Sequence, residues 1–185
     1  VSRGIDLADA RQNYAVIGCV EMGIQGKLCA FANSGYFNLL KALEITLNDG
    51  KNPLTGKQLS SHTGKATGFA TYDDLWNAFC KQLDELINHQ VAVTNVVDTM
   101  HARLAPLPFV TAITEDCIDK GLEVQSGGAK YNYDGIQAVG LADVADSLAA
   151  IKKHVFDDKS ISMEKLLEAL KANYEGYEDV RLMLT

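Results

Sequence analysis

Short apolar runs that precede stretches of helical periodicity constrain the fold of this 185-residue chain more than any other feature. Residues 14–17 form an apolar run typical of a strand that is buried on both faces. Residues 129–133 are rich in aromatic side chains and predict a second strand, which a turn at residues 134–135 ends. Since each strand is followed by helical patterns, we expect an α/β fold with crossover connections, in which helices outnumber strands.

The longest helical pattern lies between residues 72 and 103, where apolar side chains recur every three or four positions. Residues 71–74 resemble a capping box at the start of that helix. The β-branched run at residues 91–97 could also form a strand, but no turn signal flanks it, so we expect it to continue the helix. Shorter helices are predicted at residues 9–11, 36–47, 115–120, 144–155, 162–170 and 177–184.

The connections and helix ends carry recognisable turn chemistry. Glycine, serine, threonine and proline predict two loops, at residues 23–35 and 51–70. Two side chains are expected to cap the starts of short helices, Asp6 and Thr114. Two glycines are expected to end helices, Gly50 and Gly121.

Composition narrows the possible partners. A formal net charge of −7, with no concentration of lysine or arginine, argues against a nucleic-acid partner or an anionic membrane surface. Apolar runs are too short to span a membrane, and no signal peptide is visible, so we expect a cytoplasmic protein that acts on small molecules. Because the chain starts without methionine and stops within a helical pattern, we expect it to be a fragment.

The cysteines and histidines do not predict a metal site. The four cysteines lie far apart and form no CxxC pair, which argues against a zinc or thioredoxin-like motif and suggests reduced thiols. The four histidines have no partner at ligand spacing, so surface or packing roles are expected for them. These residues are Cys19, Cys29, Cys80, Cys117, His62, His89, His101 and His154.

Cys19 and Glu21 are the candidate catalytic residues. They follow the apolar run within Gly18-Cys19-Val20-Glu21, and in an extended segment they would project from the same face, with Cα atoms about 6.5 to 7 Å apart. Both could then reach one bound molecule. Considered alone, Cys19 also fits an inert buried thiol, but a carboxylate on a buried face requires a reason to be there.

Several segments of the chain, in their order, resemble the glycyl radical enzyme superfamily, the relatives of pyruvate formate-lyase. The resemblance covers nearly the whole chain. It rests on Gly18-Cys19-Val20-Glu21 and on residues 35–38, 43–50, 105–109, 127–132 and 145–153.

The resemblance implies a fold of ten strands in a barrel made from two parallel half-barrels, with helices outside and the cysteine on a loop at the centre. Residues 1–185 would supply part of this barrel, without the glycyl loop or most of the first half-barrel, and would be inactive alone. The resemblance also implies a homodimer and a protein glycyl radical that a radical SAM activating enzyme installs. It implies no directly bound cofactor and no metal.

The resemblance assigns Cys19 as the thiyl residue that takes a hydrogen atom from the substrate, and Glu21 as the base for the adjacent hydroxyl. Pyruvate formate-lyase carries two adjacent cysteines, whereas residues 19–21 are Cys-Val-Glu, so the lyase branch is favoured over acyl transfer. Residues 30–36 lack the Trp-His-Asp pattern of the glycerol and choline enzymes, and the Gly-Tyr-Phe-Asn ending favours a hydroxyproline-type dehydratase.

Alternatives remain open for both the function and the pocket. An arylacetate decarboxylase is the alternative within the family, and a non-catalytic relative or inactive scaffold is the alternative from another class. Asn33 and Tyr36, expected in a loop and at a helix start beside the catalytic segment, are candidates for substrate binding. Loop stabilisation or helix capping would explain them equally well.

Overall fold

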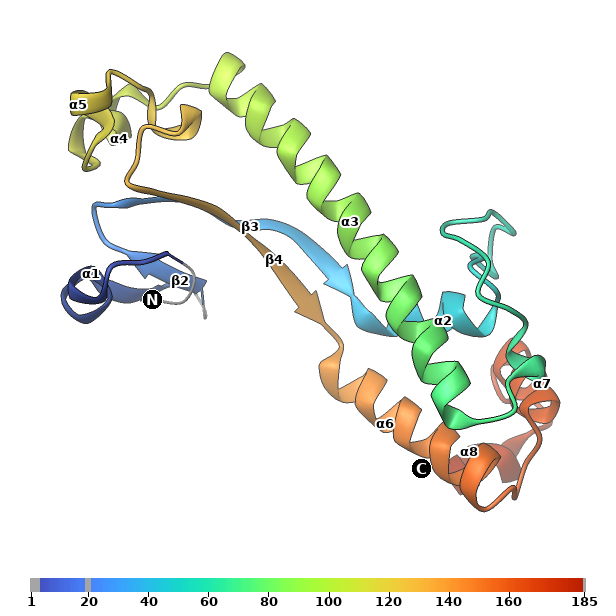
Figure 1. Cartoon of the computed structure of the whole chain (residues 1–185). Coiled ribbons are helices and arrows are strands. Elements are labelled where there is room, and N and C mark those ends of the chain that lie inside the picture. The colour runs from blue at the N-terminus through green and yellow to red at the C-terminus, as the bar shows by residue number, and fades with distance from the viewer. Residues whose placement is uncertain (1–3, 19–20, 185) are drawn as a thin grey trace. The chain divides into compact units, whose positions relative to one another are not determined.

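The computed structural model describes residues 4–18 and 21–184 (Figure 1). The chain forms two compact units, one made of Val1–Phe37 and His89–Gln137, the other of Asn38–Asn88 and Ala138–Thr185. Helices outnumber strands among the described residues, as expected. Within those residues, no helix combines the length and apolar character that crossing a lipid bilayer requires.

The first unit begins with helix α1, Leu7–Gln12, and a hairpin. Asp6 caps α1 as predicted, because its carboxylate accepts the backbone N–H of Ala8 at 2.7 Å. Strand β1, Tyr14–Ile17, pairs antiparallel with strand β2, Glu21–Ile24. The expectation that β1 is buried on both faces is wrong. Within the described ranges β1 pairs with β2 in a two-stranded ribbon, which leaves Tyr14, Val16 and Ile17 exposed.

The sequence did not predict most of a second pair of strands. Strand β3, Leu28–Asn38, pairs with strand β4, Tyr131–Val139, and Figure 1 shows both running in the same direction. The loop expected at residues 23–35 and the turn expected at residues 134–135 are therefore wrong. Pairing satisfies the backbone of both segments, and the Ser34 hydroxyl donates to the Gly135 carbonyl at 3.0 Å. The crossover connection therefore joins β3 to β4, and not the strands expected at residues 14–17 and 129–133, because residues 14–17 pair with β2.

Helix α2, Leu39–Leu47, and helix α3, Tyr72–Leu104, follow local signals closely. Gly50 ends α2 with φ +79° and donates its N–H to the Ile45 carbonyl at 2.8 Å. The capping box of α3 is confirmed, because the side chains of Thr71 and Asp74 each accept the other residue's backbone N–H. Residues 91–97 are helical, as expected.

Two short helices follow α3 in the first unit: α4, Pro108–Ile113, and α5, Cys117–Lys120. The prediction that Thr114 caps the later helix is wrong. The Thr114 hydroxyl donates to the Val110 carbonyl at 2.8 Å at the end of α4, and Asp116 takes the cap position of α5. Gly121, with φ +64°, ends α5 as predicted. A single 3-10 turn, Val124–Ser126, precedes β4.

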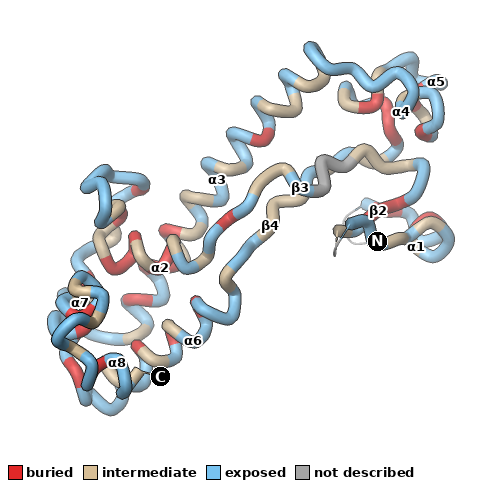
Figure 2. The backbone as a smooth tube through the Cα atoms, turned by 180° about the vertical axis from the view of Figure 1, so that it is seen from behind, coloured by how far each residue is buried: buried red, intermediate tan, exposed pale blue. Residues whose placement is uncertain are grey.

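The second unit packs helices around an aliphatic core, which Figure 2 shows as buried segments. The helix predicted from residue 162 is confirmed as α7, which Ser162 caps through the Lys165 N–H at 3.2 Å, with Ala169 buried and Leu170 exposed. Besides α2 and the first part of α3, the helical elements of this unit are α6, Leu141–Ile151, a π-helix, Lys152–Asp157, α7, Met163–Lys171, α8, Glu178–Leu184, and a 3-10 turn, Ala66–Gly68. The core includes Leu43, Ile45, Leu75, Phe79, Val144, Leu148, Leu166 and Val180.

Candidate active site

The β1–β2 hairpin holds the described part of the candidate site. Cys19 lies outside the described residues, whereas Glu21 is half-buried at the start of β2. Ile17 pairs with Glu21, so the chain has already reversed direction there. The expectation that residues 14–21 form one extended run, with Glu21 at its end, is therefore wrong. Glu21 belongs to the returning strand.

The Glu21 carboxylate has a defined position in this hairpin. Its Oε1 accepts a hydrogen bond from the Gln137 amide, and its Oε2 lies over Gly18, where an added Cβ would be only 2.7 Å away. Gly18 has φ +59°, a left-handed conformation that glycine adopts without strain. A carboxylate thus lies against the residue that directly precedes Cys19 in the sequence.

Asn33 and Tyr36 lie on strand β3, in place of the predicted loop and helix start. Both side chains are exposed, and the Asn33 amide donates to the Tyr36 hydroxyl at 3.0 Å. The structure therefore brings these two candidates together on one strand. Their strand is the neighbour of β4, which carries Gln137.

Asp9 anchors α1 to the strands that surround the candidate site. Its buried carboxylate lies 2.8 Å from Lys130 Nζ and 2.6 Å from Lys27 Nζ, and it accepts the Tyr131 hydroxyl at 2.7 Å. The Lys130, Lys27 and Tyr131 donors hold the pKa of Asp9 far below its usual range. Asp9 in turn raises the pKa of both lysines, with Glu115, 3.1 Å from Lys27, adding to the effect there. This cluster was not predicted, because its members are distant in sequence.

Two of the described cysteines, Cys29 and Cys117, lie in a packed part of the first unit. Cys29 packs against the buried cluster of Cys117, Val124 and Ala129. Burial raises the pKa of the Cys29 and Cys117 thiols, which keeps both protonated at neutral pH. Within residues 4–18 and 21–184, no three His, Cys, Asp or Glu side chains are grouped as metal ligands would be.

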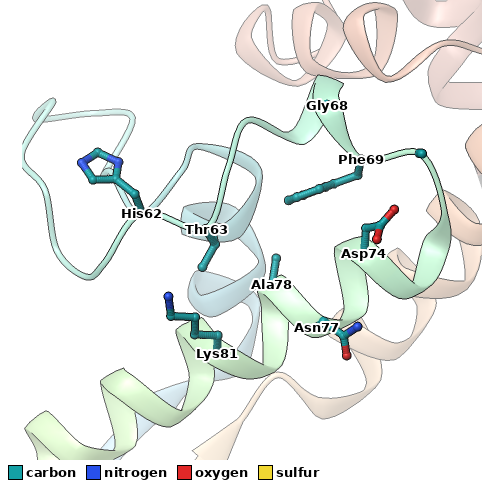
Figure 3. Close-up of a pocket in the computed structure, with 9 residues that line it drawn as sticks. His62, Thr63, Gly68, Phe69, Asp74, Asn77, Ala78 and Lys81 are labelled. Carbon is teal, nitrogen blue, oxygen red and sulfur yellow. The ribbon is translucent and has the colours of Figure 1, made fainter.

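A separate open cavity of about 540 Å³ lies in the second unit (Figure 3). It forms between the loop that precedes α3 and the first turns of that helix. Asp74 is committed there to the α3 cap, and His62 pairs with Asp49 at 2.8 Å. The lining includes His62, Thr63, Phe69, Asp74, Asn77 and Lys81, and Glu21 is not part of it.

Comparison with known proteins shows the family to which the chain belongs. Residues 1–185 match the family model described as pyruvate formate lyase-like. The chain belongs to this family. Its relatives are glycyl radical dehydratases and lyases, which confirms the resemblance drawn from the sequence. The helix-rich α/β architecture of this pyruvate formate lyase-like chain is likewise confirmed by the similarity to solved structures.

Three relatives illustrate the range. Trans-4-hydroxy-L-proline dehydratase of Clostridioides difficile is 44% identical over 96% of this chain, which spans 22% of the length of that enzyme. A structure of the B12-independent glycerol dehydratase from Clostridium butyricum is 36% identical, with a TM-score of 0.92, over 98% of this chain and 23% of the other. A structure concerning 1,2-propanediol dehydration in Roseburia inulinivorans is 41% identical, with a TM-score of 0.89, over 99% of this chain and 23% of the other.

Sequence reasoning selected Cys19 and Glu21 as candidates but did not select Gln137, which binds Glu21. The two candidates lie two positions apart in one motif, whereas Gln137 lies 116 residues from Glu21. It also follows residues 134–135, where a turn was expected. A strand prediction extended through Val139 would have placed Gln137 on β4, though not beside Glu21.

Proposed function

We propose that this chain is part of a longer glycyl radical dehydratase in which Cys19 carries the thiyl radical and Glu21 is the base. The single observation that supports this most is that, in a chain of this family, the Glu21 carboxylate lies over Gly18, the residue that precedes Cys19 in the sequence. The rest of the enzyme would complete the ten-stranded barrel and contribute the glycyl loop. It would act as a cytoplasmic homodimer after a radical SAM enzyme has activated it.

The proposed reaction uses the two residues in sequence. The glycyl radical supplies the one-electron oxidation that converts the Cys19 thiol to a thiyl. Cys19 then takes a hydrogen atom from a substrate C–H. Glu21 accepts a proton from the substrate and delivers it to the leaving hydroxyl, so that the C–O bond breaks and water departs. Cys19 returns its hydrogen atom to the product radical, and the net change is the loss of water.

The proposed substrate is a small hydroxylated metabolite of the hydroxyproline type. The 44% identity to trans-4-hydroxy-L-proline dehydratase supports this choice, as does Asn33 in a segment without the Trp-His-Asp pattern of glycerol and choline enzymes. Asn33 and Tyr36 would contact the substrate, since both present exposed hydrogen-bonding groups on β3. Asn33 offers a neutral amide, which suits a substrate that already carries its own charges.

The test uses the full-length enzyme that contains this chain, activated anaerobically, with the radical quantified by electron paramagnetic resonance. Hydroxyproline should be dehydrated faster than glycerol, propanediol or choline. Cys19→Ala and Glu21→Gln should each retain the radical but lose turnover, whereas the control Cys29→Ala, at a packing thiol, should remain active. Turnover by Cys19→Ala would refute the thiyl assignment, and turnover by Glu21→Gln would refute the base.

A further inference from the structure

Gln137 makes a long-range contact with the proposed base. Its Nε2 donates to Glu21 Oε1, and the two residues lie in the same compact unit although they are 116 positions apart. Gln137 is half-buried near the end of β4, a strand that is held along its length by pairing with β3. The amide therefore comes from a fixed element, which a positioning group requires.

The hairpin and its preceding helix are joined to β4 at two separate places. At the start of β4, Lys130 and Tyr131 bind Asp9 of α1, and near its end Gln137 binds Glu21 of β2. The two strand residues Tyr131 and Gln137 are six positions apart, or about 20 Å in extended chain. Two polar contacts at that separation restrict rotation of the hairpin relative to β4. The orientation of Glu21 is thus coupled to a rigid part of the unit.

The chemistry of an amide suits this task. Gln137 donates a hydrogen bond to Oε1, while Oε2 is the carboxylate oxygen that lies over Gly18. A neutral amide does not titrate and cannot take the proton from Glu21. A lysine or arginine at this place would stabilise the anion so strongly that it would weaken the base.

We propose that Gln137 is a positioning residue that holds the Glu21 carboxylate in its observed position, with Oε1 bound to the amide and Oε2 over Gly18. This inference rests on the proposed function, because it assigns the orientation of the base named there. Gln137 itself does not touch the reacting atoms.

Gln137→Met in the activated full-length enzyme tests the proposal, since it keeps the length of the side chain and removes the donor. We expect kcat to fall about 10- to 100-fold, a part of what general base catalysis contributes, with KM changed less than about twofold. The solvent deuterium isotope effect on kcat should rise as proton transfer becomes limiting, and radical content should remain that of the wild type. Gln90→Met is the matched control, because its amide contacts Thr94.

The outcomes separate this inference from the proposed function. If Gln137→Met matches Gln90→Met in kcat and isotope effect while Glu21→Gln is inactive, the positioning role is overturned and the proposed function stands. If Glu21→Gln remains active, the proposed function itself fails.

If Gln137→Met does not accumulate as folded protein, a second variant tests whether Gln137 positions Glu21. Gln137→Glu places two carboxylates together, and the double variant Glu21→Gln with Gln137→Glu restores a donor and an acceptor in exchanged positions. We expect the double variant to regain the folded, radical-bearing protein that Gln137→Glu alone loses, without turnover. No recovery relative to the single variant, or turnover like that of the wild type, would overturn the inference.

Discussion

Replacing Gly18 with alanine should separate the position of the Glu21 carboxylate from the stability of the hairpin. Gly18 has φ +59°, and an alanine in this left-handed region costs about 1–2 kcal/mol of unfolding free energy. The added Cβ would also lie 2.7 Å from Glu21 Oε2. The atom it meets is the end of a flexible side chain, so the carboxylate can move away at little further cost in stability.

The size of that movement follows from the contact distance. Ordinary contact with a Cβ begins near 3.4 Å, so Oε2 must shift by about 3.4 − 2.7 = 0.7 Å. A misplacement of about 1 Å in a reacting group can cost about 100-fold in rate. We therefore expect Gly18→Ala to lower kcat by about 10- to 100-fold, with a smaller effect on KM.

Gly26→Ala is the matched control for backbone strain. Gly26 has φ +69° and follows β2, but a Cβ at this position would have no atom within 4 Å. Both variants should lose similar unfolding free energy in the full-length enzyme, measured by chemical denaturation. Only Gly18→Ala should lose kcat, measured per glycyl radical in the activated enzyme.

Equal kcat values for the two glycine variants would refute this reasoning. That result would mean that the carboxylate does not need its observed position over Gly18. Loss of radical in Gly18→Ala alone would also contradict it, because the effect would then lie in activation and not in the orientation of the base.

Two further predictions concern the structural anchors. Asp9→Asn should lower the melting temperature at neutral pH, because it breaks the ion pairs with Lys27 and Lys130. The pKa of Asp9 is depressed in the folded state, so its contribution to stability is present above pH 4 and is lost as the pH falls below about 4 through the folded-state pKa. Melting curves of the wild type and the variant should therefore converge at acidic pH. Gln82→Leu should remove the hydrogen bond that the fully buried Gln82 amide donates to the Ser61 carbonyl at 2.8 Å, which should lower the unfolding free energy by about 1–3 kcal/mol. Amide hydrogen exchange in the loop at residues 51–70 should then accelerate about tenfold or more. Unchanged protection of that loop would contradict the prediction.

The helices were predictable because their signals are local. The capping box at residues 71–74 and the apolar period through residue 103 predicted a helix whose actual bounds are Tyr72–Leu104. A cap and a 3.6-residue period involve neighbours in sequence, so their energetic effect does not depend on distant segments. The same reasoning placed Gly50 and Ser162 correctly at helix ends.

The paired strands β3 and β4 were not predictable in the same way. Residues 30–35 are mostly small or polar, without the alternation that marks a half-buried strand. Their strand conformation depends on a partner about 100 residues away, as the Ser34–Gly135 hydrogen bond shows. Such pairing overrides local propensity, because a backbone in a ladder satisfies its hydrogen bonds whatever its side chains prefer.

The candidate site divides along the same line between local and distant information. Cys19 and Glu21 are two positions apart, so a motif sufficed to select them as candidates, although the pairing of β1 with β2 places Glu21 on the returning strand. Gln137 could not be selected, because a glutamine in a mixed sequence has no distinguishing pattern. Its effect arises from geometry alone, since an amide near a carboxylate stabilises charge only within hydrogen-bond reach. A motif can therefore select the groups proposed to react, while the proposed positioning residue is found only because the fold brings Gln137 within hydrogen-bond reach of Glu21.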